Sequence, residues 1–525
     1  MKRTVYTLLV ICLLVIACTD DTSGKEVSTI LYVPLDERPV NLDYAAEIIN
    51  ATGENLLIPP VEYLPRQKTP GHTGKLWQWV FENCPRADYI VLSADTMIYG
   101  GLTPSRIHNL DKNTLDNLLS NFDRIKELNP EVKLYVFSTI MRTHKQNTSL
   151  AEPDYYGTYG KKIYQITALR DKDEVDGLSP GEKMQLGELL EDVPKDVLND
   201  YMNRRAKNFS VNSTLLDKTA AGVIDHFVLC RDDTSYYSQS SREFRLLSAK
   251  TYNLPAGKFT SLSGADEVGL VLLTRAVNDL NAAQPAVFVR YARGVGGMTI
   301  PKYEDYEVWK NVGDHLNAAG CVPAYSPEDA DLILAVNTPV NGVTREAGTE
   351  QNAAESTWGV FSLVKEMAAD IAGGKKVAVA DISYANGSDN GLMAALAHGG
   401  LLNKISAYAG WNTAGNSLGY ALGQGILAQY MNEKDVLNIL AVRLLDDWGY
   451  QANVRGEVQR EVIASSNVNK FNLGANGALV KSEVEYRLLQ FAEAYLKDFN
   501  IEKLTVSFPW NRTFEINLKL SRTSN

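Results

Sequence analysis

The sequence predicts an α/β protein built on mostly parallel sheets. Short apolar runs rich in β-branched residues alternate with amphipathic stretches of helical spacing. A polar cluster follows most of these runs at once. Alternation of this kind is typical of βαβ units, in which helices cover the faces of a parallel sheet.

The predicted strands are short and precede the C-terminal part of the chain. They are Thr29–Leu35, Tyr89–Ser93, Lys133–Ser138, Ile224–Cys230, Ala286–Tyr291, Asp331–Val336, Lys376–Ala380 and Lys404–Ala409. Apolar residues at helical spacing predict helices at Leu115–Leu128, Val268–Leu280, Phe361–Ile371 and Ser417–Met431. The first of these helices is expected to stop at Asn129, because Pro130 cannot continue it.

Composition also indicates the domain organisation. Residues 1–17 are predicted to be a signal peptide, and residues 18–27 a lipidated tether. Residues 28–280 predict an N-terminal α/β domain, either (β/α) barrel-like or an open parallel sheet, with a polar helical insertion at about 146–220. Residues 281–435 predict a second α/β domain of the Rossmann or flavodoxin type. Residues 436–525 predict a small α+β unit that contains a strand pair.

The N-terminal residues combine the features of a bacterial export signal. Lys2 and Arg3 precede an apolar run, residues 4–17, that is too short to span a bilayer comfortably. The run ends in VIAC, which resembles a lipobox, in which the cysteine is lipidated and becomes the mature N-terminus. We therefore expect a lipid anchor at Cys18 and an extracytoplasmic location at the bacterial outer membrane, on its periplasmic or cell-surface face. The alternative is an ordinary signal peptide with an incidental cysteine.

Charge and cysteine content argue against several classes of protein. The formal net charge of −11 becomes −13 when Lys2 and Arg3 leave with the signal. An acidic chain without a basic block argues against a nucleic-acid partner. Cys84, Cys230 and Cys321 are scattered, so buried free thiols are expected rather than a disulfide framework or structural zinc. The sequence contains neither a P-loop lysine pattern nor HExxH.

Clusters of charged and amide residues follow the predicted strands. The carboxyl ends of parallel strands share one edge of a sheet, where ligands bind, so we expect the clusters to line one cleft. For any single cluster a helix N-cap or a turn is an ordinary alternative, because both favour Asp and Asn. The candidate substrate-binding residues are Asp36, Glu37, Arg38, Asp95, Tyr99, Arg142, Arg231, Asp381, Tyr384, Asn386, Asp389, Trp411, Asn412 and Asn416.

Two adjacent carboxylate pairs are the candidate catalytic groups. Asp266 and Glu267 open a predicted helix, and Asp232 and Asp233 follow Arg231. Adjacent carboxyl groups can divide roles, one kept ionised by its neighbours and the other protonated because its pKa is raised. The alternatives are an acidic first helical turn, which the helix dipole favours, and plain ion pairing to the arginine.

Trp411 and its neighbouring amides suit sugar recognition. An exposed aromatic ring stacks on the apolar face of a sugar, while the side chains of Asn412 and Asn416 bond its hydroxyls. A buried tryptophan in a capped turn is the alternative. The segment Trp510-Asn511-Arg512 is expected to contribute to the same cleft.

Taken together, the clusters resemble an uncharacterised bacterial family, the domain of unknown function 4127. The matching segments are VPLDERPVN (33–41), LSADTMIYGGLTPSR (92–106), RDDT (231–234), GADEVGLVLLTRA (264–276), ISYANGSDNGL (382–392) and AYAGWNTAGNSLG (407–419). The resemblance implies that the clusters form one constellation. A local likeness also runs to β-hexosaminidases, in which an Asp-Glu or Asp-Asp pair at a barrel strand end assists a substrate acetamido nucleophile.

These observations predict a lipoprotein that hydrolyses glycans or glycoconjugates, without nucleic-acid partners and with its lipid anchor as the contact to the membrane. Glu267 is the expected general acid, and Asp266 or Asp233 the partner that orients or stabilises. Arg38, Arg142 and Arg231 are expected to set pKa values or to hold an anionic group.

Two alternatives remain open at this stage. The first is a metal-dependent amide or phosphate hydrolase with Asp36, Asp95 and Asp232 as ligands. The leading hypothesis needs no cofactor, but a carboxylate-rich cleft also suits Mg²⁺ or Ca²⁺. The second alternative is a carbohydrate-binding lipoprotein without catalysis.

Overall fold

An open parallel sheet forms the centre of the N-terminal half. In the computed structural model, which describes residues 27–232, 235–466 and 468–522, its strand order is β2-β1-β3-β4-β5-β6. Every neighbouring pair is parallel, and β2 and β6 are the two edges, so the sheet does not close into a barrel. The strands are β1 (Thr29–Val33), β2 (Asn55–Leu57), β3 (Tyr89–Ser93), β4 (Lys133–Ile140), β5 (His226–Arg231) and β6 (Phe259–Ser263). The prediction of a parallel sheet is confirmed, and its barrel-like variant is wrong. The predicted signal peptide, Cys18 and Asp233 lie outside the described residues.

A second parallel sheet follows along the chain, in the order β13-β11-β9-β7-β8. Its strands are β7 (Ala286–Tyr291), β8 (Val322–Pro323), β9 (Leu332–Asn337), β11 (Val377–Asp381) and β13 (Ala407–Ala409). Numbered within each half, both sheets begin with the order 2-1-3-4-5, which is the flavodoxin-like doubly wound order. The flavodoxin-like expectation for the second half is therefore confirmed.

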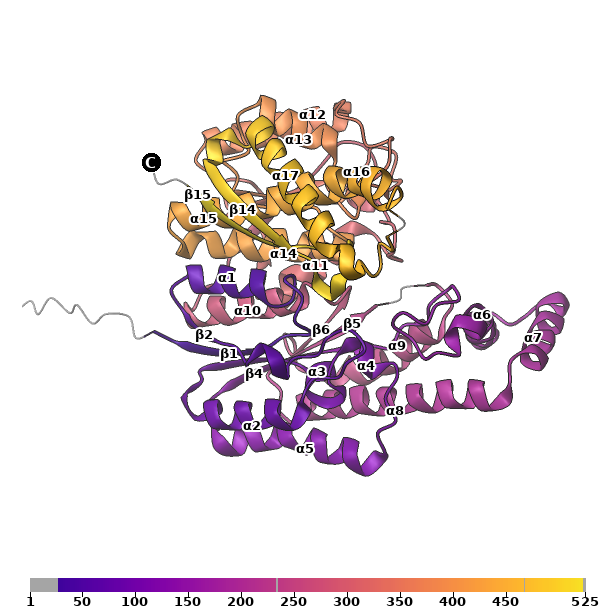
Figure 1. Ribbon diagram of the computed structural model, residues 1–525. Coiled ribbons are helices and arrows are strands. Elements are labelled where there is room, and N and C mark those ends of the chain that lie inside the picture. The colour runs from indigo at the N-terminus through magenta and orange to yellow at the C-terminus, as the bar shows by residue number, and fades with distance from the viewer. Residues whose placement is uncertain (1–26, 233–234, 467, 523–525) are drawn as a thin grey trace, which may run out of the picture.

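Helices cover both faces of the first sheet. Figure 1 shows α1 (Asp43–Ala51) and α10 (Val268–Leu280) on the face that meets the second half, and α2 (Thr73–Asn83), α5 (Lys112–Leu128) and α8 (Lys195–Ala220) on the other. Alternate residues of β1 follow this division, because side chains of a strand alternate between faces. Ile30 and Tyr32 belong to the core under α10, and Leu31 and Val33 to the core under α2 and α5.

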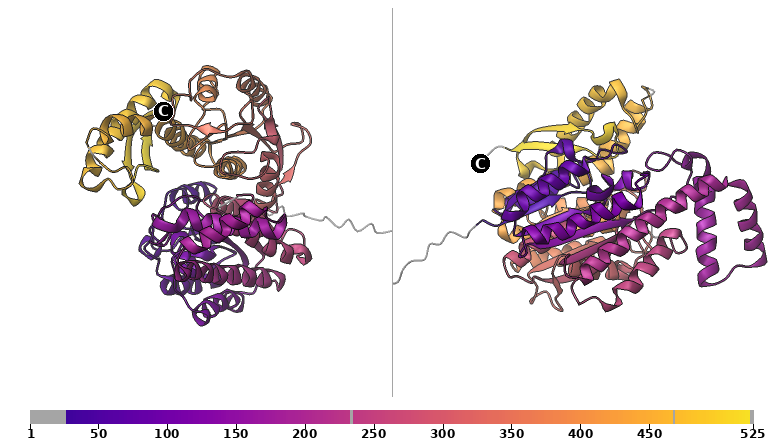
Figure 2. Two further views of the ribbon diagram at one scale, coloured as in Figure 1. Left: turned by 90° about the vertical axis from the view of Figure 1, so that its right-hand side faces the viewer. Right: turned by 90° about the horizontal axis from the view of Figure 1, so that it is seen from below.

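A helical arm projects from the first domain. Helices α6 (Tyr156–Val175), α7 (Pro180–Asp192) and α8 lie between β4 and β5, and α7 stands away from the body in Figure 1 and in the right view of Figure 2. Ser179 starts α7 with a reciprocal capping box to Glu182. The arm has a small apolar core of its own around Tyr156 and Tyr201.

The remaining helices surround the second sheet and the C-terminal strand pair. They are α11 (Val308–Ala318), α12 (Trp358–Ala372), α13 (Asn390–His398), α14 (Ala414–Leu427), α15 (Glu433–Arg443), the π-helix η6 (Leu444–Val454), α16 (Arg455–Val458), the π-helix η7 (Gln459–Ile463) and α17 (Gly477–Tyr495). The predicted C-terminal strand pair is present as β14 (Ile501–Ser507) and β15 (Asn517–Arg522), which pair antiparallel. The short parallel pair β10 (Arg345–Glu346) and β12 (Tyr384–Ala385) lies outside both large sheets. Helices α3 (Ala94–Tyr99), α4 (Leu102–Ser105) and α9 (Gln239–Lys250) complete the first domain.

The two domains share one apolar core. The buried cluster that contains Tyr32 of β1 also contains Val336 of β9 and Val379 of β11. Within this seam α10 packs directly on α14. In the part of the chain that the structure describes, no helix has the length and apolar character of a membrane span.

Glycines on α14 permit the close approach of α10. A methyl group on Gly419 would lie 2.6 Å from Cγ of Glu267, and one on Gly423 would lie 2.9 Å from Oγ1 of Thr274. These glycines are four residues apart and therefore lie on the same face of the helix. The two helices therefore pack so closely that these two positions of α14 have no room for a side chain.

Gly419→Ala should destabilise the protein by about 1–3 kcal/mol, because the added methyl group overpacks this contact. Gly187→Ala on the exposed helix α7 is the matched control, since nothing lies within 4 Å of the added atom. The control should gain about 0.5–1 kcal/mol from helix propensity. Chemical unfolding of both variants measures the difference, and equal midpoints would show that the seam is not tightly packed.

Candidate functional site

The polar residues that follow β1, β3, β4, β5 and β6 lie along one edge of the first sheet. Its strand order changes direction at β1, and α1 and α5, the long helices on either side of this point, cover opposite faces. Ligands of open α/β sheets bind at such a switch point. Thr96, after β3, donates from Oγ1 to the carbonyl of Leu35 at 2.8 Å and so ties the two loops together.

Arg38 is the centre of this edge. Its Nε lies 2.9 Å from Oδ2 of Asp36, and its two terminal nitrogens lie 2.6 and 3.2 Å from the two oxygens of Asp266. Nη1 also lies 3.5 Å from Oε2 of Glu515. We call Asp36, Arg38, Asp266 and Glu515 the arginine centre. It joins the loop after β1, the start of α10 and the C-terminal segment.

All members of the arginine centre are shielded from water, and their charges depend on one another. The Arg38 side chain is 6% exposed and that of Asp266 is 12% exposed. Burial raises the pKa of Asp36, and the charge of Arg38 opposes that rise. Burial likewise raises the pKa of Glu515. Burial alone would lower the pKa of Arg38, but Asp266 and Asp36 raise it well above its usual value, so the guanidinium stays charged.

Glu37 lies beside this centre and is different in character. Its Oε1 accepts from Nε1 of Trp510 at 2.9 Å, and its Oε2 is buried without a hydrogen-bond partner among the described residues. Burial, reinforced by Asp36, raises the pKa of Glu37 to about 7. The side chain remains 17% exposed. Glu37 therefore carries a proton much of the time near neutral pH, although it stands next to an ionic cluster.

Residues 510–515, which we call the strap, bring an aromatic ring to the same place. The Trp510 ring lies between the guanidinium groups of Arg38 and Arg512, at 4.9 and 4.4 Å from its centroid. Trp510 and Asn511 have φ angles of 54° and 53°, in the left-handed region that side chains disfavour. Consecutive strained residues of this kind cluster at ligand sites, because the surrounding structure must hold them.

A second ionic group lies further along the same edge. Asp95 accepts from the backbone and Oγ1 of Thr139, both at 2.8 Å, and burial raises its pKa to about 6. Arg106 bonds Asp232 and lies 3.6 Å from Glu152. Two other predicted site residues belong to this second ionic group. Nη2 of Arg142 lies 2.6 Å from Oε1 of Glu152, and the buried hydroxyl of Tyr99 has no hydrogen-bond partner among the described residues.

Glu267 does not face the edge. It is completely buried, and its nearest ionic neighbour is Nε2 of His315 at 3.6 Å. Neither of its carboxyl oxygens has a hydrogen-bond partner among the described residues, and burial raises its pKa. The adjacent pair thus divides: Asp266 turns to Arg38, and Glu267 turns into the seam between α10 and α14.

Glu304 and Asn311 stand beside Glu267 in the seam. Glu304 accepts from the backbone nitrogen of Gly415 at 2.7 Å and from Asn311 at 2.6 Å. Burial raises the pKa of Glu304 to about 7. Glu304 and Asn311 could not be predicted from the sequence, because no local motif marks a contact between two domains.

The predicted site residues of the second domain form a separate buried network. Asn337 donates to Asp381 at 2.9 Å and to Asp389 at 3.0 Å, and burial raises the pKa of Asp381 to about 7. Asp389 also caps the start of α13. This network lies at the carboxyl edge of the second sheet, so the expected single cleft is divided between two sheets.

The other predicted residues of the second domain make structural contacts. The Tyr384 hydroxyl donates to the carbonyl of Gln351, and the backbone nitrogen of Asn386 donates to the carbonyl of Asn412 at 2.9 Å. Trp411 is 5% exposed and packs on Phe514 at a centroid distance of 5.7 Å. Its ring is therefore not free to stack on a sugar in this arrangement. Asn416 donates to Oγ1 of Thr413, the N-cap of α14.

Arg231 lines a cavity of about 490 Å³ between the edge of the first sheet and α11. We call this cavity the seam pocket. None of the residues that line it belongs to the arginine centre. Its walls are Arg231, Phe244, Ser261, Asp305, Tyr306, Trp309, Lys310, Gly313 and Asp314.

The three carboxylates that the metal-dependent alternative would use as ligands each contact other protein groups. Among the described residues, no group of three or more His, Cys, Asp or Glu side chains is arranged to hold a metal ion. Asp36 is bound by Arg38, and Asp232 by Arg106. Asp95 accepts two hydrogen bonds from Thr139. The three proposed ligands thus have protein partners of their own.

Sequence reasoning missed Arg106, Glu152 and Glu515. Arg106 stands in the LTPSR segment that carries the family resemblance, and this was a usable signal. No strand end or motif marks Glu515 or Glu152, and their contacts with the distant residues Arg38 and Arg106 appear only in the fold.

Arg38→Met should cost about 3–5 kcal/mol of stability, because it leaves buried carboxylates without their cation. Arg293→Met is the matched control: its side chain is 62% exposed and pairs with Glu366 at 2.8 Å. An exposed pair contributes about 1 kcal/mol or less. Calorimetric unfolding measures the loss of stability in both variants. Similar losses would show that the arginine centre stabilises the protein no more than an exposed ion pair does.

Comparison with known proteins gives a family and no named relative. No curated protein and no solved structure matches the chain. The model of one family, described as "Protein of unknown function (DUF4127)", matches residues 30–519 and so includes both sheets and the strap. The chain belongs to the DUF4127 family.

Proposed function

We propose that this protein is a hydrolase of glycans or glycoconjugates that works by carboxylate acid–base catalysis at the arginine centre. The observation that supports the proposal most is the pair Glu37 and Asp266. Both belong to the switch-point edge, but burial raises the pKa of Glu37, whereas Asp266 is paired with the Arg38 guanidinium. Two carboxyl groups divided in this way are the usual requirement for cleavage of a glycosidic bond.

Glu37 is the proposed general acid. Its pKa, raised by burial to about 7, keeps a proton available at neutral pH. Trp510 occupies Oε1 as a donor, so the proton belongs on Oε2, which has no other described partner. Because Oε2 is covered in this arrangement while the side chain is 17% exposed, the carboxyl group must turn toward the substrate to give this proton to the oxygen of the leaving group.

Asp266 is the proposed ionised partner. Arg38 donates to both of its oxygens, which is the bidentate geometry of an arginine–carboxylate pair. A fixed negative charge of this kind stabilises the oxocarbenium-like transition state, or acts as nucleophile or base toward water. Arg38 and Asp36 act as positioning residues, since they hold Asp266 in place.

This proposal moves the acid role from Glu267 to Glu37. Glu267 has no exposed surface and lies behind Asp266. Its place in the seam supports a structural role in the contact between the two domains. Asp232 remains on the edge, 26% exposed and bonded to Arg106, as a substrate-binding candidate.

We further propose that the chain is exported and lipid-anchored at Cys18. The lipobox-like VIAC segment and the short apolar run before it support this. Such an anchor would place the hydrolase outside the cytoplasm, where glycans are abundant substrates.

Product release from a broad panel of glycans tests the hydrolase proposal. Glu37→Gln and Asp266→Asn should each lower kcat by about 10²-fold or more, because acid–base and charge-stabilising groups contribute at least this much. Asp381→Asn, in the separate network of the second sheet, is the control and should keep its activity. Turnover that a chelator abolishes would replace this proposal with a metal-dependent hydrolase. Glycan retention without any release would favour a binding protein.

The pH profile gives an independent check on Glu37. An acid must be protonated to act, and Glu37 loses its proton as pH rises through about 7. Therefore kcat/KM should fall about tenfold per pH unit above that value. In Glu37→Gln this alkaline limb should be absent from the residual activity, and an unchanged limb would assign the acid to another group.

A further inference from the structure

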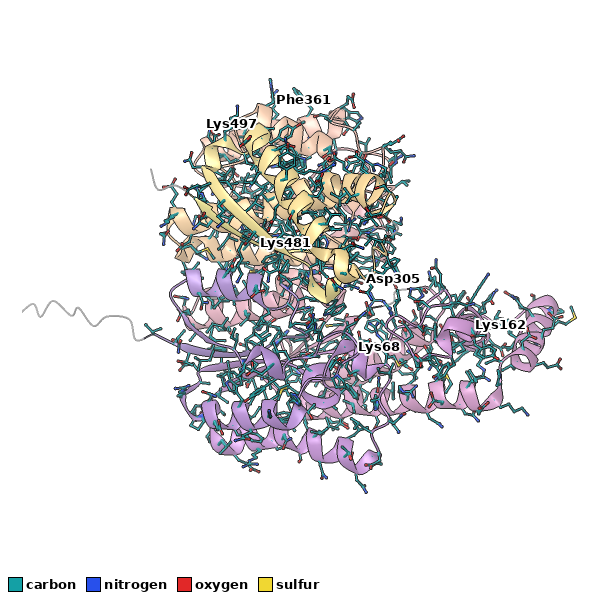
Figure 3. All side chains as sticks on the ribbon, viewed as in Figure 1. Lys68, Lys162, Asp305, Phe361, Lys481 and Lys497 are labelled. Carbon is teal, nitrogen blue, oxygen red and sulfur yellow. The ribbon has the colours of Figure 1, made fainter. Side chains whose placement is uncertain are left out.

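We propose that the seam pocket binds neutral sugar residues of the substrate, next to the point of cleavage. This inference rests on the proposed function for the identity of the ligand class. The cavity volume of about 490 Å³ lies within the range of small-molecule sites and exceeds what a single sugar ring fills. Figure 3 shows Asp305, one of its wall residues, at the seam between the two domains.

The charges of the wall balance one another. Arg231 and Lys310 contribute two positive charges, and Asp305 and Asp314 two carboxyl groups. Arg231 pairs with Asp305 at 3.1 Å, so its charge is already neutralised inside the wall. A polyanionic chain such as a polyuronide would therefore gain little here. A neutral, hydroxyl-rich ligand fits this balance.

Two wall atoms lack the partner that a hydroxyl would supply. Nε of Arg231 and Oδ1 of Asp305 are buried and have no hydrogen bond to the described residues. The first is a donor and the second an acceptor, and the two side chains are directly paired. A sugar hydroxyl both accepts and donates, so one such group, or two neighbouring ones, can satisfy both atoms.

The aromatic side chains of the pocket divide into two kinds. Phe244 and Tyr306 hold the Arg231 guanidinium at 4.5 and 5.1 Å from their ring centroids, which fixes the arginine in place. Trp309, in the first turn of α11, lines the pocket and is 49% exposed, and the Lys310 ammonium lies 5.5 Å from the centroid of its ring. A half-exposed indole that lines the same cavity as these polar atoms can stack on the apolar face of a sugar through the ring face that remains open.

The seam pocket is connected to the proposed catalytic residues through one short loop. The carbonyl of Arg231 accepts from the backbone of Gly264 at 3.0 Å, and its Nη2 donates to Ser263 at 3.2 Å. Gly264 precedes Asp266 by two residues. A saccharide chain held in the pocket would therefore continue along this loop toward Asp266.

Binding to a catalytically disabled protein tests the inference apart from catalysis. The full chain carrying Asp266→Asn is titrated calorimetrically with maltotetraose, cellotetraose, chitotetraose and mannotetraose. At least one of these neutral probes should bind, and polygalacturonate fragments of equal length should bind at least tenfold more weakly. Trp309→Ala in the same background should weaken the probe that binds by at least tenfold. Trp309→Phe should restore part of that affinity, because it keeps an aromatic face.

Trp358→Ala is the matched control, since Trp358 is 62% exposed on α12 and does not line the seam pocket. Its affinity should equal that of the parent. The inference is overturned if none of the four probes binds, or if Trp309→Ala binds as the parent does. Binding that depends on Trp309 in a protein that hydrolyses no glycan would keep the pocket and reject the hydrolase. Hydrolysis of a glycan by a protein whose glycan binding does not depend on Trp309 would keep the hydrolase and reject the pocket.

Discussion

The pairing of Arg38 with buried carboxylates is the constraint on which the rest of the site depends. An ionised side chain that is buried away from water is stable only when an opposite charge contacts it, and otherwise it becomes neutral. Arg38 pairs with carboxylates of the loop after β1, the start of α10 and the strap, and in the strap Arg512 also pairs with Glu515 at 2.6 Å. The three segments therefore meet at the same cation, and Glu37 and the strained Trp510 lie beside it.

Much of the fold could be predicted from local pattern. Strands of buried parallel sheets are continuous apolar runs, and β3, β7 and α10 have the predicted bounds. The strands β2 and β8 were not predicted, because one is partly exposed at an edge and the other is a two-residue pair. The thiols of Cys84, Cys230 and Cys321 are free and buried, as the scattered spacing predicted.

The site could be predicted only in part. Asp36, Glu37, Arg38, Asp95 and Asp266 do share one edge, because the ends of parallel strands meet there. The directions of Asp266 and Glu267 could not be predicted, since neighbouring positions at a helix start point to different sides. Asp381 and Asp389 were assigned to the same cleft because sequence shows that a strand ends, but not to which of two sheets the strand belongs.

The strap has a consequence for the order in which the molecule can assemble. Trp510 meets Glu37 across 473 positions of the chain. During synthesis the first sheet can therefore form long before the residues that cover its edge exist. Until the strap arrives, Arg38 faces an open surface and has Asp36 and Asp266 as its partners. Completion of the site is thus a late event of biogenesis, and a nascent chain remains without a finished centre until its second domain has been made.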